Sequence, residues 1–297
     1  MYRLRILVLL FLPAFVQAQD QLLGELSQLD SAGKVPVQAT FKSTRVVNGH
    51  SVETMRARHL DFRISHRFGR VNMGAYHFFG LDQATMRMGL EYGLTNRLMI
   101  GVGRSTSEKT YDAFAKYRLL RQSSGPGSFP VSVTLFASAA AATVNREASF
   151  EDKLSYATQL LIARKFGERL SLQVSPTWIH RNVVAAGDEQ DVLAVGVGGR
   201  FKLTKRVSLN GEYFWTARDE SLIPVHYYNS MSFGVDIETG GHVFQLHFTN
   251  SLGMIERQFI AETTGSWGKG DIHYGFNISR TFSFDKRTRK NAPSNEN

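Results

Sequence analysis

Residues 272–284, which read IHYGFNISRTFSF, constrain the fold of this chain more than any other segment. Successive side chains of a β-strand point to opposite faces of the sheet. One face of this strand would carry Ile272, Tyr274, Phe276, Ile278, Arg280, Phe282 and Phe284, and the other face only polar or small residues. A long strand with one apolar face and aromatic residues towards both ends is typical of a strand that crosses an outer membrane in a β-barrel.

The same alternation recurs along the rest of the chain and predicts about twelve strands. The segments that carry it are 60–65, 85–92, 98–103, 111–119, 131–144, 154–166, 170–182, 192–203, 207–217, 230–239, 242–252 and 272–284. A single-chain bacterial barrel has an even number of strands. We therefore predict an all-β fold, a transmembrane antiparallel up-and-down β-barrel. A soluble β-sandwich or a lipocalin-like secreted barrel is the alternative.

The lengths of the connections support the membrane barrel independently. Short or turn-rich connections lie at 93–96, 122–130, 167–169, 204–206 and 240–241, and longer ones at 69–83, 145–152, 183–190, 218–229 and 253–270. Short and long connections therefore nearly alternate, with 105–108 as a short exception. Outer-membrane barrels have short periplasmic turns and long outer loops. This phase predicts that both termini lie in the periplasm.

The N-terminus resembles a secretory signal peptide. Arg3 and Arg5 precede an apolar stretch at 6–16, and small residues at 16 and 18 predict cleavage before Gln19. We expect residues 1–18 to be the signal peptide and 19–58 to be a periplasmic or plug segment with a short helix near 21–30. The barrel is expected at 59–284 and a disordered polar tail at 285–297. An exported chain that forms a membrane barrel is expected to reside in the cell outer membrane.

Composition excludes several kinds of chemistry. The chain has no cysteine, so disulfides and thiolate metal sites are excluded, and its nine histidines form no chelating pair. The glycine runs at 101–103 and 196–199 lack the lysine and the helix of a phosphate loop, so we interpret them as sites of close packing or lumen space. We expect no cofactor and no metal.

The expected partners follow from charge and location. The net charge of +9 is dispersed and lies partly in the signal peptide and the tail, so nucleic acid is not expected. We expect contacts with outer-membrane lipid and lipopolysaccharide, with the barrel assembly machinery, and with a small solute. His66 and Arg280 fall on the lipid face near strand ends, where a long side chain reaches the headgroups.

Nine charged residues point into the lumen by the same alternation and are the candidate pore-lining residues. They are Arg63, Arg67, Arg87, Glu91, Lys116, Arg118, Glu212, Asp236 and Glu238. In one interpretation, basic and acidic sectors face each other across a pore and set ion selectivity. In the other, the charges pair with each other or with the N-terminal segment and fill the lumen. The sequence leaves both open.

Several segments together resemble a known family. They are ATFKSTRVVNGHSVE at 39–53, LDFRISHRFG at 60–69, FFGLD at 78–82, GLEYGLT at 89–95, KTYD at 109–112, QLHFTN at 245–250 and FNISR at 276–280. This set is similar to a Bacteroidota family of outer-membrane β-barrel proteins of unknown function. The resemblance implies the fold and the location, and it implies no activity and no functional residues.

The expected function is a narrow pore or a binding barrel for small solutes, because twelve strands lie between a filled eight-stranded barrel and the open porins. The alternative is a non-conducting structural or interaction barrel that acts through its loops or its periplasmic segment. An outer-membrane enzyme ranks third. His247, Asn250 and Ser251 cluster in sequence, but His247 faces the lumen and Asn250 the lipid, so we expect no catalytic activity.

Overall fold

The computed structural model describes residues 33–218 and 225–285. The expected signal peptide, the expected helix near 21–30 and all but the first residue of the expected tail lie outside this part of the chain. No helix among the described residues is long and apolar enough to cross a membrane.

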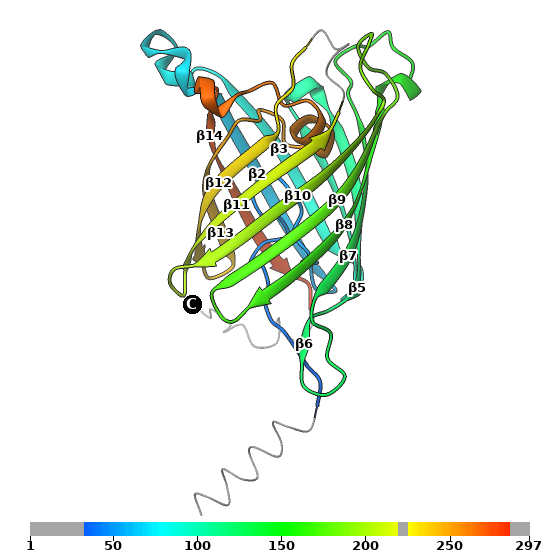
Figure 1. Ribbon diagram of the computed structural model, residues 1–297, viewed down its shortest axis with the longest axis vertical. Helices are drawn as coiled ribbons and strands as arrows, with labels where there is room; N and C mark the ends of the chain where they lie inside the picture. The colour runs from blue at the N-terminus through cyan, green and yellow to red at the C-terminus, as the bar shows by residue number, and fades with distance from the viewer. Residues whose placement is uncertain (1–32, 219–224, 286–297) are drawn as a thin grey trace, which may run out of the picture.

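Twelve antiparallel strands form a closed barrel, which confirms the predicted fold (Figure 1). The strands are β2 (His59–Arg70), β3 (Ala84–Gly93), β4 (Leu98–Ser105), β5 (Tyr111–Leu120), β7 (Ser132–Ala141), β8 (Leu154–Phe166), β9 (Leu170–Arg181), β10 (Asp191–Lys202), β11 (Val207–Ala217), β12 (Ser230–Thr239), β13 (His242–Thr249) and β14 (His273–Ser283). Each strand pairs with its neighbours in the chain, and β14 pairs with β2 to close the ring.

The closing strand β14 alternates as its sequence predicts. His273, Gly275 and Asn277 are buried inside the barrel, and the residues between them face outward. On the outer face, Phe276 stacks on the His66 ring with centroids 4.9 Å apart and ring planes within 1° of parallel. His66 therefore points outward, as predicted. Arg280 also points outward, where its guanidinium group covers the Phe282 ring.

Short and long connections lie nearly at opposite ends of the barrel, as predicted. The connection at 106–110 is the short exception among the long ones, and 121–131 is the long exception among the short ones. One end, here called the turn end, carries the connections at 94–97, 121–131, 167–169, 203–206 and 240–241. The other, here called the loop end, carries 71–83, 106–110, 142–153, 182–190, 250–272 and the described residues 218 and 225–229 between β11 and β12. Figure 1 shows the loops gathered at the top and the turns at the bottom.

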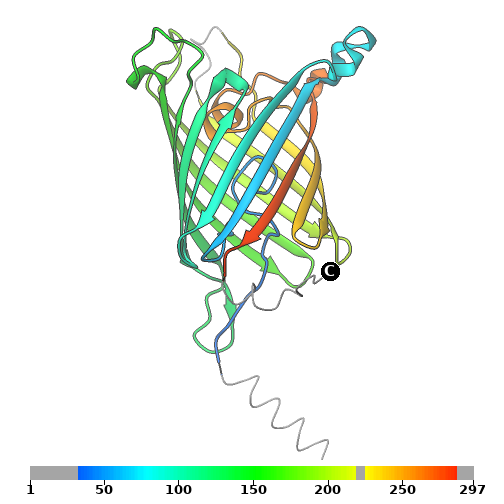
Figure 2. The same cartoon turned by 180° about the vertical axis from the view of Figure 1, so that it is seen from behind.

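The N-terminal part of the described chain enters the barrel from the turn end. There β1 (Val35–Pro36) pairs with β6 (Ser123–Ser124) below the barrel. Residues 40–53, here called the plug segment, then lie in the lumen, and Figure 2 shows them as a blue loop inside the barrel. The segment doubles back on itself through an isolated bridge between Arg45 and His50.

The interior has an apolar side and a polar side. The apolar side is a cluster of inward-facing residues on β4, β5 and β7–β11 with part of the 250–272 loop, including Phe136, Leu161 and Ile179. Elsewhere the wall is mostly polar. The plug segment contacts both sides, since the centroid of its His50 ring lies 4.2 Å from that of Phe136. At Gly101 and Gly196 a Cβ atom would collide with the rings of Phe114 and Phe214, so these glycines provide room for inward-facing aromatic rings, in line with the close packing expected from the sequence.

Candidate functional site: the plugged lumen

One carboxylate of the wall holds the tip of the plug segment. Glu212 of β11 accepts hydrogen bonds from the backbone N–H groups of Val47, Asn48 and Gly49, with N–O distances of 3.1, 2.7 and 3.0 Å. Three successive N–H groups around one anion form the concave arrangement known as a nest. The carboxylate therefore satisfies backbone donors that would otherwise be buried without partners.

On another part of the wall, Lys116 of β5 binds the flanks of the same segment. Its ammonium group donates to the carbonyl oxygens of Thr44 at 3.2 Å and Ser51 at 2.6 Å, and also to that of Glu53. An ammonium group has three donors, so this set uses all of them. Wall amides and a hydroxyl complete the contacts: Gln173, Gln245, Asn277 and Thr134 each bond to the backbone of residues 46–52.

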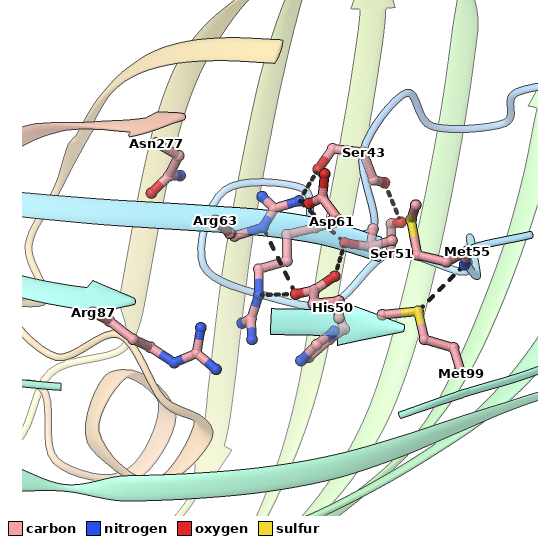
Figure 3. A network of polar contacts seen from close by, with 12 residues as sticks. Ser43, His50, Ser51, Met55, Asp61, Arg63, Arg87, Met99 and Asn277 are labelled. Atoms are coloured by element: carbon pink, nitrogen blue, oxygen red, sulfur yellow. Dashed lines mark hydrogen bonds and ion pairs between the residues drawn. The ribbon is translucent and has the colours of Figure 1, made fainter. Parts of the chain in front are cut away.

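A compact charged network joins the plug segment to β2 and β3 (Figure 3). Arg63 donates to the hydroxyls of Ser43 and Thr44 and lies 3.3 Å from Asp61. Thr44 in turn donates to Glu91, which lies 3.7 Å from the guanidinium groups of both Arg63 and Arg45. Two arginines therefore share one buried carboxylate, and one of these arginines belongs to the plug segment.

The structure places all nine candidate pore-lining residues in the lumen, and each has a polar partner. Arg67 bonds to Asn48 and Asn277, Arg87 to Asp112, Arg118 to Glu53, Asp236 to Gln245, and Glu238 to Arg200 and Lys42. The remaining four are described above. Seven of the nine, all except Arg87 and Asp236, contact residues 40–53, so the charges act largely as contacts between wall and plug.

The longest loop closes the lumen from the opposite end. Residues 250–272 fold back into the mouth of the barrel, where the short helix η5 (Arg257–Ala261) buries Phe259 and Ile260 against the apolar side. Just before it, Glu256 lies 3.8 Å from Arg45 and 3.4 Å from His50 of the plug segment. Strand alternation does not predict this contact, although the apolar residues at 254, 255, 259 and 260 are a signal that the loop is buried.

A cavity lies on each side of this barrier. The loop-side vestibule has a volume of about 660 Å³ and is lined by residues that include Arg70, Gln258 and Asp271. The turn-side vestibule has about 690 Å³ and is lined by residues that include Asp61 and Arg118. Both lie along β2, which runs from Asp61 at one vestibule to Arg70 at the other. Between the two vestibules the lumen holds the plug segment, Glu256 and the buried side chains of the wall.

The arrangement brings together no nucleophile and base at the cluster considered for catalysis. His247 is buried in the lumen, whereas Ser251 donates only a long bond to the carbonyl of Gly253. Asn250 is not on the lipid face as expected, because β13 ends at Thr249 and the Asn250 amide is buried and bonds to Gly265 and Asn229. Among the described residues, no three histidine or carboxylate side chains converge as a metal site would require.

The strand order and the lumen agree with a comparison of family sequences. Residues 41–282 match the model of a family described as a membrane bound beta barrel domain (DUF5777). The chain belongs to this family. The matched range begins at the plug segment and ends in β14, so the family includes the plug as well as the barrel. The chain is thus a membrane-bound β-barrel.

Three solved barrels of similar fold are distant from this chain in sequence. The NanC porin is 10% identical, with a TM-score of 0.46 over 76% of this chain and 99% of that chain. The KdgM porin in complex with disordered oligogalacturonate is 11% identical, with a TM-score of 0.47 over 75% and 99%. An outer membrane channel from Pseudomonas putida F1 is 12% identical, with a TM-score of 0.45 over 78% and 98%. A search of curated proteins found no match.

Proposed function

We propose that this protein is an outer-membrane channel for small solutes whose lumen is closed by the plug segment. The observation that carries the proposal is the pair of vestibules, about 660 and 690 Å³, with the plug segment and the inward-folded loop between them among the buried side chains of the wall. Hydrogen bonds and ion pairs hold the backbone and the charged groups of the plug to the wall, beside a small apolar cluster of Phe41, Val46 and Val52 with Ala163. Water and solute ions can replace such contacts one by one, whereas a packed apolar core offers no such route.

The orientation follows from the loop lengths and is part of the proposal. The turn end faces the periplasm and the loop end faces the exterior, as in bacterial barrels generally. The plug segment then enters from the periplasm, behind an N-terminal segment that an export signal delivers there. Outer-membrane lipid and lipopolysaccharide surround the outward face, and the barrel assembly machinery inserts the chain.

Planar-bilayer recording of the folded protein tests the channel. Glu212→Ala removes the acceptor of three plug N–H groups, so we expect it to show more frequent discrete openings than the wild type. Asp112→Asn is the matched control, because Asp112 is a buried lumen carboxylate that pairs with Arg87 of the wall. Absence of openings in both the wild type and Glu212→Ala would reject the channel.

A non-conducting interaction barrel is the second candidate. It is favoured by the docked loop at 250–272, which reinforces the plug from the opposite side instead of leaving that mouth open. The same recordings separate the two, since this candidate predicts no current in any variant. We also propose that the barrel is not an enzyme. Hydrolysis of outer-membrane lipid by the purified wild type, lost in Ser251→Ala, would overturn that view.

A further inference from the structure

We propose that the turn-side vestibule is a binding site for small polyanions, solutes that carry two or three carboxylate or phosphate groups. The inference deepens the proposed function and rests on it, because this vestibule is the periplasmic mouth of the same lumen. Its lining includes five cationic side chains, Lys42, Arg56, Arg63, Arg118 and Arg121, and two carboxylates, Glu53 and Asp61.

The two vestibules have charges of opposite sign. Five cations and two carboxylates give the lining of the turn-side vestibule a formal charge of +5 − 2 = +3. The lining of the loop-side vestibule has Arg70 against Glu108, Glu262 and Asp271, which gives +1 − 3 = −2 with His273 neutral. Rings and patches of like charge select ions by sign at the mouths of pores. An anion is therefore attracted to the turn end, whereas the carboxylates at the loop end pair with Arg257, Arg181 and Arg70 and leave no excess of cations there.

Part of the positive charge of the turn-side vestibule is not neutralised by the protein. Lys42 lies 2.8 Å from Glu238 and Arg63 lies 3.3 Å from Asp61, so these two cations are paired. Arg121 uses its Nε only to donate to the carbonyl of Val37, at 3.2 Å. Within the described part of the chain, neither Arg121 nor Arg56 has a carboxylate within 4.0 Å.

Arg118 is intermediate between the paired and the unpaired cations, because it has one carboxylate partner and also lies near Arg121. Its guanidinium group lies 3.4 Å from Glu53, a contact in the long range for a hydrogen bond, and it experiences the like charges of Arg97 and Arg121. A bound anion would relieve this repulsion and accept hydrogen bonds from planar guanidinium groups, which match carboxylate and phosphate geometry in pairs. A neutral solute of the same size gains neither effect.

Equilibrium titration of the purified protein in detergent tests the site, with citrate as the probe at low ionic strength. We expect saturable citrate binding that weakens as salt is added, because the site is open to screening. Arg121→Gln and Arg56→Gln should each weaken citrate binding by about tenfold, the loss expected for one charged hydrogen bond. Arg121→Lys, which retains the charge without the planar fork, should bind with intermediate affinity.

Two controls make the result specific. Arg70→Gln removes a cation from the loop-side vestibule, where it lies 3.2 Å from Asp271, and should leave citrate binding unchanged. Trimethyl citrate, the neutral ester, should not bind. The proposal fails if folded wild type does not bind citrate, if the ester binds equally well, or if Arg56→Gln and Arg121→Gln leave the affinity unchanged. Because binding at equilibrium needs no current, failure of the channel in bilayers would leave this test standing.

Discussion

The guanidinium group of Arg45 lies 3.8 Å from the carboxylate of Glu256 in the middle of the barrel. Arg45 belongs to the plug segment, which enters from the turn end, and Glu256 belongs to the loop that folds in from the loop end. The two residues are buried, and 211 positions of the sequence separate them. This ion pair is therefore the place where the two closures of the lumen touch, and it makes each depend on the other.

A double-mutant cycle measures this dependence. We predict that Glu256→Gln and Arg45→Gln each destabilise the barrel, because each leaves a buried charge short of a partner. The double variant should be less destabilised than the sum of the two by about 1–3 kcal/mol, the range for residues in one network. The measurement is the free energy of unfolding in a urea titration, with the folded fraction taken from the heat-modifiable band.

A second cycle provides the control for this pair. Asp271 lies in the same loop as Glu256 but pairs with Arg70 at the vestibule instead of with the plug segment. Asp271→Asn should therefore be additive with Arg45→Gln. Additivity of Glu256→Gln with Arg45→Gln as well would show that the plug segment and the loop are energetically independent.

The ammonium group of Lys116 gives a second prediction, about local stability of the plug. Lys116→Met keeps the length of the side chain but leaves the carbonyls of Thr44, Ser51 and Glu53 without this donor. A buried polar group left without a partner costs about 1–3 kcal/mol. Amide hydrogen exchange at Val46 and Ser51, whose N–H groups bond within the plug segment, should therefore accelerate strongly.

Lys205→Met is the matched control for this variant, because Lys205 is exposed in the turn between β10 and β11. It makes the same chemical change without touching the plug segment. Equal exchange rates at Val46 in the wild type and in Lys116→Met would contradict the role assigned to the ammonium group.

The glycines of the lumen face give a third prediction, about packing. A Cβ atom at Gly196 would collide with the Phe214 ring, whereas one at Gly240 would have no atom within 4 Å. We predict that Gly196→Ala destabilises the barrel by about 1–3 kcal/mol, the usual cost of overpacking. Gly240→Ala should be nearly neutral, and Phe214→Leu should recover part of the loss in Gly196→Ala. A neutral Gly196→Ala would show that the ring moves aside freely.

The barrel itself was predictable from local rules. Alternation in β14 assigns its faces residue by residue, and the lengths of the connections assign the two ends, because both are properties of short segments. The same alternation correctly placed Lys116 and Glu212 in the lumen. Their partners were not predictable, since Glu212 binds N–H groups 163 to 165 positions away and no local pattern encodes such a contact.

The loop at 250–272 is the part of the fold that strand alternation and connection length did not predict correctly. The connection at 253–270 was expected only to be a long outer loop, yet Phe259 and Ile260 are buried against the apolar side of the lumen. Inward-facing residues such as Ile179 and Leu161 provide that apolar surface. Where a strand has apolar residues on both faces, its alternation does not show that the lumen has an apolar side. An apolar run within a long loop between two barrel strands is the feature that distinguishes this case.

The loop between β13 and β14 carries the fourth prediction, a pH dependence at Glu262. Burial raises the pKa of Glu262 above its ordinary value of 4.5, and the charges of Arg257 and Arg181 only partly oppose that shift. The carboxylate lies 3.1 Å from Arg257 and 3.3 Å from Arg181. Because the pKa is higher in the docked loop than in the released one, this group stabilises docking fully below pH 4.5.

That stabilisation is lost as the pH rises from 4.5 through the raised pKa, so the loop should dock less tightly across this window. We predict that hydrogen-exchange protection of the η5 amides, corrected for the intrinsic rate, falls over the same window in the wild type. In Glu262→Gln the protection should stay constant, because the amide does not titrate. Protection that increases with pH in the wild type, or an equal fall in Glu262→Gln, would show that another group controls the loop.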